Sequence, residues 1–193
     1  MSGGPAASVV GGVACVLLVA LVAWAVAAYN RLVRLRNQAE ASWAQIDVRL
    51  KRRCDLIPNL VETVKGYAAH ERGTLDAVVA ARGSAMSVAQ GTGPAGRAGA
   101  EDVLTQTLGR LFAVAEAYPD LKANQNFAAL QAELATTEDK IAYARQFYNS
   151  AVQSLNTAVQ TLPSNLIAGI GGFRAKDFFA AAGDKRGPVQ VRF

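Results

Sequence analysis

The chain has 193 residues, of which 51% are hydrophobic and only 18% are charged, a composition that excludes a fully disordered protein. The length accommodates one compact domain and a short additional segment. A single histidine excludes any site that needs two imidazoles. The two cysteines, Cys15 and Cys54, have no paired metal-binding spacing and offer no disulfide framework.

The net charge of +5 is concentrated in one part of the chain. Residues 1–30 carry no charged side chain, whereas residues 31–53 hold seven basic and two acidic side chains. From residue 54 onward, thirteen basic and thirteen acidic side chains cancel. The whole excess of positive charge therefore follows directly after an uncharged segment.

Residues 8–29 read SVVGGVACVLLVALVAWAVAAY and predict a transmembrane helix. An uncharged apolar run of about 20 residues is long enough to cross a bilayer. Trp24 and Tyr29 lie toward its C-terminal end, where aromatic side chains favour the membrane interface. Small residues four positions apart, Ser8 with Gly12 and Ala23 with Ala27, give weak support for helix association in the membrane.

Basic residues flank this segment on its C-terminal side, and no basic side chain precedes it. The three that follow at once are Arg31, Arg34 and Arg36. We expect residues 1–7 outside the cytoplasm, the rest of the chain inside it, and these arginines as anchors at an anionic leaflet. A cleaved signal peptide is the alternative, because Ala25-Val26-Ala27 resembles a cleavage site, but the basic residues lie on the wrong side for one.

Residues 30–162 predict a cytosolic antiparallel four-helix bundle that continues from the membrane helix, with apolar residues at helical spacing. The expected helices span residues 30–53, 56–90, 100–118 and 122–162. Asp55 is placed to cap the second helix, with Pro58 in its first turn. The fourth helix has the longest apolar seam, a coiled-coil-like pattern that requires partner helices along its length.

Glycine, proline and acidic residues between these helices set their expected bounds. The Gly- and Pro-rich segment from Gly91 to Gly99 predicts a loop. Glu101 and Asp102 are then expected near a helix N-terminus, where negative charge is favourable. Pro119 is expected to end the third helix.

Residues 163–193 predict an apolar segment followed by a C-terminal tail. The large apolar side chains of the segment are Leu166, Ile167, Ile170 and Phe173. The antiparallel topology brings the segment close to the bilayer, so it either enters the lipid headgroup region or folds onto the helices as an ordinary buried end. The closing residues PVQVRF alternate in polarity and predict either a strand that pairs with another chain or a disordered end.

Two polar features allow both a structural and a functional interpretation. Glu71 falls on the inward face of the second helix, where a bond to a Lys, Arg or Tyr of a neighbouring helix is favoured over a proton- or ligand-sensing site. The basic cluster Arg49–Arg53 is interpreted as a solvated helix C-terminus rather than a docking patch for an acidic partner. Its lack of interleaved aromatic residues argues against nucleic acid.

No catalytic constellation is found in the sequence. A di-iron bundle needs two Glu-x-x-His motifs, and one histidine, His70, cannot serve two. No P-loop, Rossmann glycine pattern, nucleophile elbow or zinc-binding helix motif is present. We therefore expect no enzymatic activity, no cofactor and no metal.

Long blocks of the chain closely resemble the LemA family. They are KRRCDLIPNLVETVKGY, QAELATTEDKIAYARQFYN and LPSNLIAGIGGF, within a match over about residues 29–179. The resemblance implies a bacterial membrane protein with one N-terminal span, an external N-terminus, a cytosolic helical domain and no established catalytic residue.

These observations favour a membrane-tethered scaffold that assembles with itself, contacts membrane lipids and a further protein partner, and organises or remodels the membrane. An accessory subunit or adaptor of a membrane protease or envelope-stress system is the alternative. In either case the expected location is the inner membrane of a bacterial cell.

Overall fold

A computed structural model describes the backbone of residues 4–89 and 91–179 and side chains from residue 10 onward in those ranges. Its helices are α1 (Gly4–Lys65), α2 (Arg72–Ala89), α3 (Pro94–Ala115), α4 (Pro119–Lys122), α5 (Gln125–Gln160) and α6 (Ser164–Ile170). No strand occurs among the described residues, so the predicted all-α class is confirmed. The closing residues PVQVRF lie outside the described ranges.

The chain divides into two compact units. Among the described residues, unit 1 comprises residues 4–40 and 150–176, and unit 2 comprises residues 41–89, 91–149 and 177–179. The long helices α1 and α5 each contribute a segment to both units.

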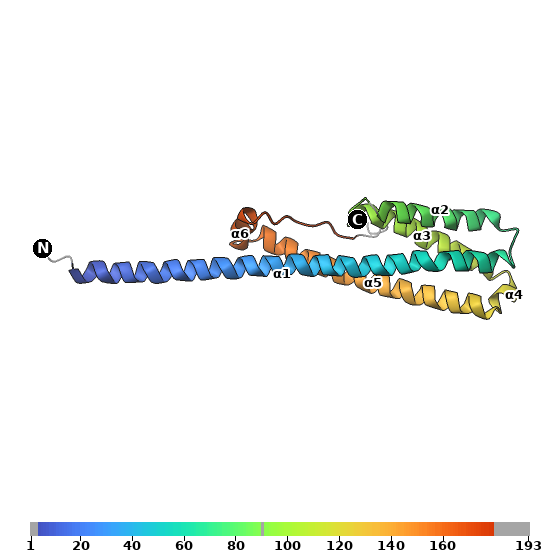
Figure 1. Cartoon of the computed structure of the whole chain (residues 1–193), viewed down its shortest axis with the longest axis horizontal. Coiled ribbons are helices and arrows are strands. Elements are labelled where there is room, and N and C mark those ends of the chain that lie inside the picture. The colour runs from blue at the N-terminus through green and yellow to red at the C-terminus, as the bar shows by residue number, and fades with distance from the viewer. Residues whose placement is uncertain (1–3, 90, 180–193) are drawn as a thin grey trace, which may run out of the picture. The chain divides into compact units, whose positions relative to one another are not determined.

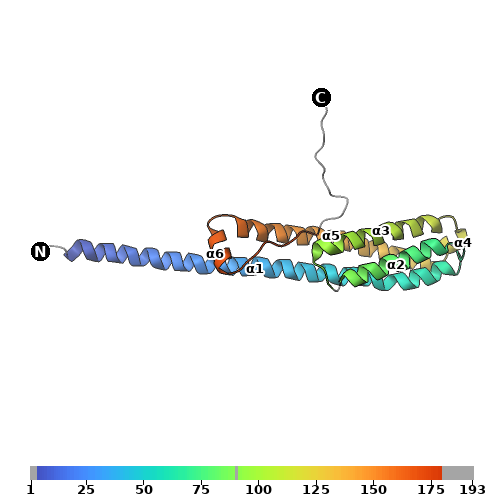
Figure 2. The same ribbon diagram turned by 90° about the horizontal axis from the view of Figure 1, so that it is seen from above.

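Unit 2 contains a helical bundle, which takes up residues 41–149 of the range 30–162 in which a bundle is predicted. The C-terminal part of α1, α2, α3 and the N-terminal part of α5 lie side by side in both views (Figures 1 and 2). Each of these segments contributes to one apolar core, which includes Ile57, Leu60, Val64, Val78, Leu104, Leu111, Phe127 and Leu134. The buried apolar positions therefore follow the helical spacing that the sequence predicts, although Val79 of α2 is 52% exposed.

The predicted hairpin near Asp55 is wrong, because α1 continues without interruption to Lys65 and contains Pro58 in its interior. The first helix of the bundle therefore does not end at residue 53, and the second begins at Arg72 rather than at residue 56. The reason is that the buried positions Leu50, Ile57 and Leu60 keep one helical stripe across the proline. Burying that stripe outweighs the cost of one missing helix hydrogen bond.

The other helix bounds also differ from the expected ones. Pro94 is the first residue of α3, so the loop is shorter than the expected Gly91–Gly99. Glu101 therefore lies well inside the helix rather than near its N-terminus. Pro119 begins the short helix α4 instead of ending α3 directly. The side chain of Asn124 then caps α5, accepting hydrogen bonds from the backbone N–H groups of Asn126 at 2.9 Å and Phe127 at 3.1 Å.

Unit 1 joins the N-terminal part of α1 to the C-terminal part of α5 and to α6. Its small core consists of Leu32, Ala158, Ala168 and Phe173, with Val33, Leu35, Val159 and Ile167 packed partly buried against it. Both views show α6 beside α1 (Figures 1 and 2). Leu162, the last residue of the helix expected over residues 122–162, lies beyond α5 and is 76% exposed.

Candidate functional site

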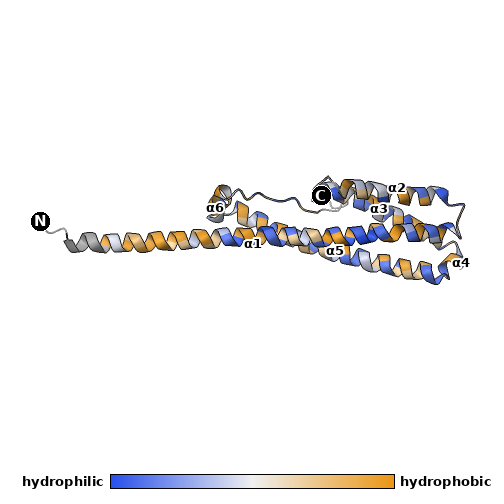
Figure 3. Cartoon of the chain, in the orientation of Figure 1, coloured by the Kyte–Doolittle hydropathy of each residue, from blue (hydrophilic) through white to orange (hydrophobic). Residues whose placement is uncertain are grey.

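The N-terminal part of α1 is suited to crossing a membrane. From Val10 to Trp24 every side chain is exposed, and Figure 3 shows this stretch coloured as hydrophobic around the helix. Among the described residues, one helix is long and apolar enough to span a bilayer, and its apolar window is entirely unburied. A helix that is apolar on all sides buries itself in a protein core or in lipid, and within the described part of the chain no core covers this one.

The predicted anchoring residues lie at the end of this apolar stretch and just beyond it on the same helix. Trp24 is 39% exposed and Tyr29 is 46% exposed. The three arginines, Arg31, Arg34 and Arg36, are all exposed. An aromatic band followed by basic side chains is the order found where a helix leaves the bilayer.

The end of α6 is fixed by a backbone motif at Gly172. This glycine has φ +67°, a left-handed conformation that L side chains rarely adopt. The Phe173 N–H donates to the Ala168 carbonyl at 2.9 Å, and the Gly172 N–H donates to the Gly169 carbonyl at 3.4 Å. These are the two bonds of a Schellman motif, which reverses the chain and directs Phe173 back toward the helix.

Phe173 attaches this turn to α1 in unit 1. Its ring meets the Tyr29 ring edge to face, with centroids 5.5 Å apart. The guanidinium carbon of Arg36 lies 5.3 Å from the centroid of the Phe173 ring, within the range of a cation–π contact. Phe173 therefore joins two of the predicted anchoring residues to the segment after α5.

The predicted apolar segment separates into two environments. Phe173 is 7% exposed and Ile167 packs partly buried against the core of unit 1. Leu166 and Ile170 are 61% and 87% exposed. The expectation that the run folds onto the helices thus holds for two of its four large side chains, and the other two face outward.

The backbone after Phe173 is held by Asn156 of α5. Its side-chain amide donates to the Lys176 carbonyl at 2.9 Å, and its amide oxygen accepts the Lys176 N–H at 2.8 Å. The Lys176 ammonium in turn lies 2.9 Å from the Glu40 carboxylate. Hydrogen bonding to Lys176 is the main reason that the pKa of Glu40 is lowered.

Glu71, the predicted core carboxylate, lies in the connection between α1 and α2 and is half-buried. Its Oε1 accepts a hydrogen bond from the Tyr118 hydroxyl at 3.1 Å. That bond raises the pKa of Tyr118. The predicted tyrosine partner is therefore present, whereas the predicted place on the inward face of a helix is wrong.

Sequence reasoning missed a buried arginine in unit 2. Arg53 was expected in a solvated helix end, but its side chain is 0% exposed. Its guanidinium forms an ion pair with Glu101 of α3 and donates to Glu138 of α5 at 2.8 Å and to the Thr105 hydroxyl at 2.9 Å. The spacing of Arg53 from Leu50 and Ile57 places it on the same buried stripe and could have indicated its burial. The helix end expected at residue 53 pointed instead to an exposed side chain.

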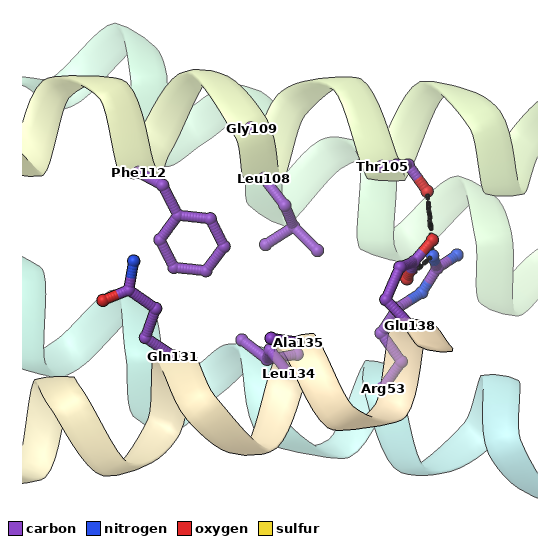
Figure 4. Close-up of a pocket in the computed structure, with 9 residues that line it drawn as sticks. All are labelled: Arg53, Thr105, Leu108, Gly109, Phe112, Gln131, Leu134, Ala135 and Glu138. Carbon is purple, nitrogen blue, oxygen red and sulfur yellow. Dashed lines mark hydrogen bonds and ion pairs between the residues drawn. The ribbon is translucent and has the colours of Figure 1, made fainter. Parts of the chain in front are cut away.

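A pocket of about 280 Å³ lies beside this arginine. Figure 4 shows apolar side chains of α3 and α5 along it, including Leu108, Phe112 and Leu134, with Arg53 and Glu138 at one end. The buried Nε of Arg53 has no hydrogen-bond partner. The pocket combines an apolar wall with a charged end, an arrangement suited to a small apolar group that carries a polar atom.

A second aromatic and charged cluster in unit 2 surrounds Phe179. Its ring packs on Trp43 with centroids 5.5 Å apart, and the Arg145 guanidinium carbon lies 4.6 Å from its centroid. Burial lowers the pKa of Arg145. The Tyr148 hydroxyl donates to the Asp177 carbonyl oxygen at 2.9 Å, so the described end of the chain is held along α5.

Comparison with known proteins identifies the family. The model of the LemA family matches residues 42–193. The magnetosome protein MamQ of Magnetospirillum gryphiswaldense is 28% identical over 185 residues, a match that covers 84% of this chain and 68% of that protein. The magnetosome protein MamQ 2 of Paramagnetospirillum magneticum is 27% identical over 186 residues, with the same coverage of 84% and 68%.

A more distant relative carries the family name itself. Protein LemA of Metamycoplasma hominis is 26% identical over 140 residues, covering 72% of this chain and 63% of that protein. The family model alone matches well over half of this chain. The chain therefore belongs to the LemA family.

Proposed function

We propose that this chain is a single-pass scaffold protein, held in the membrane by the apolar part of α1 and self-associating through its helical bundle. The unburied apolar helix and the basic residues after it support the tether. The proposed location is the inner membrane, with the bundle on the cytoplasmic side. The proposal assigns no catalytic step to the protein.

The observation that carries self-association is an exposed aromatic face on unit 2. Tyr143 and Phe147 of α5 are 74% and 45% exposed, and Val48 of α1 is 67% exposed. Tyr143 and Phe147 also line a hollow of about 390 Å³ together with Gln45, Arg49, Asp139, Lys140 and Ala144. Exposed aromatic side chains beside a hollow are typical of protein interfaces, where they supply much of the binding energy.

The charges of this face suit a second copy of the same chain. Arg49 and Lys140 are basic and Asp139 is acidic, so the hollow carries both signs. In a twofold dimer the same patch meets itself, and opposite charges on one patch can then pair across the axis. An adaptor role would instead place a different membrane protein on the same face.

The test is the mass of the full chain in detergent, measured by sedimentation or native mass spectrometry. The wild type should be an oligomer, and Tyr143→Asp combined with Phe147→Asp should shift it to the monomer. Val79→Asp is the matched control, because Val79 is an exposed apolar residue of α2 away from the hollow. A wild type that is monomeric at all concentrations contradicts the scaffold, and crosslinking from position 143 to another membrane protein would then support the adaptor.

A further inference from the structure

Three large apolar side chains of unit 1 point away from the protein at the end of α5 and along α6. Leu162 is 76% exposed, Leu166 is 61% exposed and Ile170 is 87% exposed. Leu166 and Ile170 are four residues apart, so they lie on one face of the helix. Apolar side chains at this degree of exposure, gathered over nine residues, indicate a surface that is covered in the working protein.

This surface is held in place against α1. The Phe173 ring contacts the Tyr29 and Arg36 side chains, and Ala168 is buried in the same core as Leu32. At the start of α6 the Ser164 hydroxyl lies 2.7 Å from the Ala158 carbonyl oxygen. The exposed leucines and isoleucine are therefore fixed beside the place where α1 changes from apolar to basic.

The charges around the apolar surface are almost entirely positive. Residues 30–40 and 150–176 contain five basic side chains and one acidic side chain, which are Arg31, Arg34, Arg36, Arg174, Lys176 and Glu40. Lys176 and Glu40 pair with each other. The charge that remains is positive and belongs to the four arginines.

We propose that Leu162, Leu166 and Ile170 insert into the headgroup region of the leaflet from which α1 emerges, while the neighbouring arginines contact anionic lipid headgroups. The inference rests on the proposed membrane tether and names its second point of contact. Amphipathic segments with this division of apolar and basic residues lie in the plane of the membrane interface. Basic side chains at the membrane surface add attraction to anionic lipids.

A second copy of the chain is a poorer occupant of this surface. In a twofold contact the same arginines would approach one another, and like charges that are brought together repel. Tyr29, by contrast, places the Phe173 contact at the end of the apolar part of α1, where the membrane interface is expected. A leaflet supplies both the apolar volume and the negative charge that the surface lacks.

The experiment uses the full chain with Cys15→Ala and a single added cysteine carrying an environment-sensitive fluorophore. Cys54 is buried and burial raises the pKa of its thiol, so it resists labelling. Ile170→Cys and Leu166→Cys are the test positions. Gln153→Cys is the control, because Gln153 is exposed on α5 and lies about 10 Å along the helix before its end at Gln160.

Each protein is reconstituted in vesicles of phosphatidylcholine and phosphatidylglycerol that contain a nitroxide-labelled lipid. The fluorophores at positions 166 and 170 should shift their emission to the blue and lose intensity to the lipid quencher, whereas the fluorophore at position 153 should do neither. Equal emission at all three positions overturns the inference.

Alkaline extraction of the same vesicles separates the two proposals. If the chain stays in the membrane while the fluorophore at position 170 is unquenched, the tether stands and the second contact is wrong. If extraction releases the chain, the tether itself is wrong. Crosslinking of position 170 between copies, without lipid quenching, would assign this surface to self-association instead and overturn the lipid contact.

Discussion

Arg82 supplies the hydrogen bond that Pro58 cannot make. Proline has no backbone N–H, so the carbonyl four residues earlier, that of Cys54, loses its partner within α1. The Arg82 Nε, from α2, donates to that carbonyl oxygen at 2.7 Å. The proline inside α1 is thus tolerated because a neighbouring helix satisfies the acceptor that it leaves open.

We predict that Arg82→Met destabilises the wild-type bundle by about 1–3 kcal/mol, because a charged donor to a partly buried carbonyl is removed. In a Pro58→Ala background the same change should cost less, since the new backbone N–H can bond to the Cys54 carbonyl. Urea unfolding in detergent gives the free energy of each variant. Equal effects of Arg82→Met in both backgrounds would show that the arginine does not compensate for the proline.

The adjacent arginines Arg52 and Arg53 should differ strongly in their contribution to stability. Arg53→Met leaves the Glu101 carboxylate, 2% exposed, without its counterion, and should cost about 3–5 kcal/mol. Arg52→Met breaks an ion pair between two more exposed side chains, Arg52 at 63% and Glu133 at 38%. This change should lower the stability by no more than about 1 kcal/mol. Thermal or urea unfolding of the two variants compares them under the same conditions.

A double variant tests whether the loss in Arg53→Met comes from an unpaired carboxylate. Arg53→Met combined with Glu101→Leu removes both buried charges, and replacing a buried ion pair by apolar residues is often close to neutral. The double variant should therefore be more stable than Arg53→Met alone. If it is less stable, packing of the arginine stem rather than charge pairing accounts for the loss.

Tyr148 provides a pH-dependent contribution to the stability of unit 2. Burial, and secondarily the nearby Asp177 charge, raises the pKa of this tyrosine from 10.0 to about 12. Because the folded-state pKa is the higher one, the stabilisation is fully present below pH 10.0 and is lost as the pH rises to about 12. A spectrophotometric titration of phenolate should show a tyrosine that ionises near pH 12 in the wild type and is absent from Tyr148→Phe. Identical late titration in the variant would assign that group elsewhere.

The fold was predictable to the extent that it depends on apolar periodicity. Leu32, Ile46 and Leu50 are buried in α1 as their spacing predicts, and so are Leu134 and Ile141 in α5. The hairpin expected at Asp55 does not form, because burial of the stripe through Ile57 outweighs the local capping and proline signals. Local preferences are a weak guide when a long buried face continues across them.

The candidate sites were predictable only where they depend on position along the apolar part of α1. Tyr29, at the end of the apolar run, and Arg36, just after it, are predicted from their positions, but their shared contact with Phe173 requires the Schellman turn at Gly172. The buried charges could not be recognised, because the pairing of Arg53 with Glu101 depends on a helix register that a sequence alone does not give. Contacts between residues that are distant in the sequence are therefore the part of the candidate sites that the sequence does not predict.

The turn after α6 can be tested with a pair of glycines that differ in backbone conformation. Gly172→Ala places a side chain at φ +67° and should cost about 1–2 kcal/mol locally, because L residues are strained there. Gly169→Ala should be neutral or stabilising by up to about 1 kcal/mol, since Gly169 is helical and an added Cβ meets no atom within 4 Å. Amide hydrogen exchange at Phe173 reports the local opening free energy of the turn. Exchange should be faster in Gly172→Ala and unchanged or slower in Gly169→Ala; the opposite order would mean that the left-handed glycine does not hold Phe173 against α1.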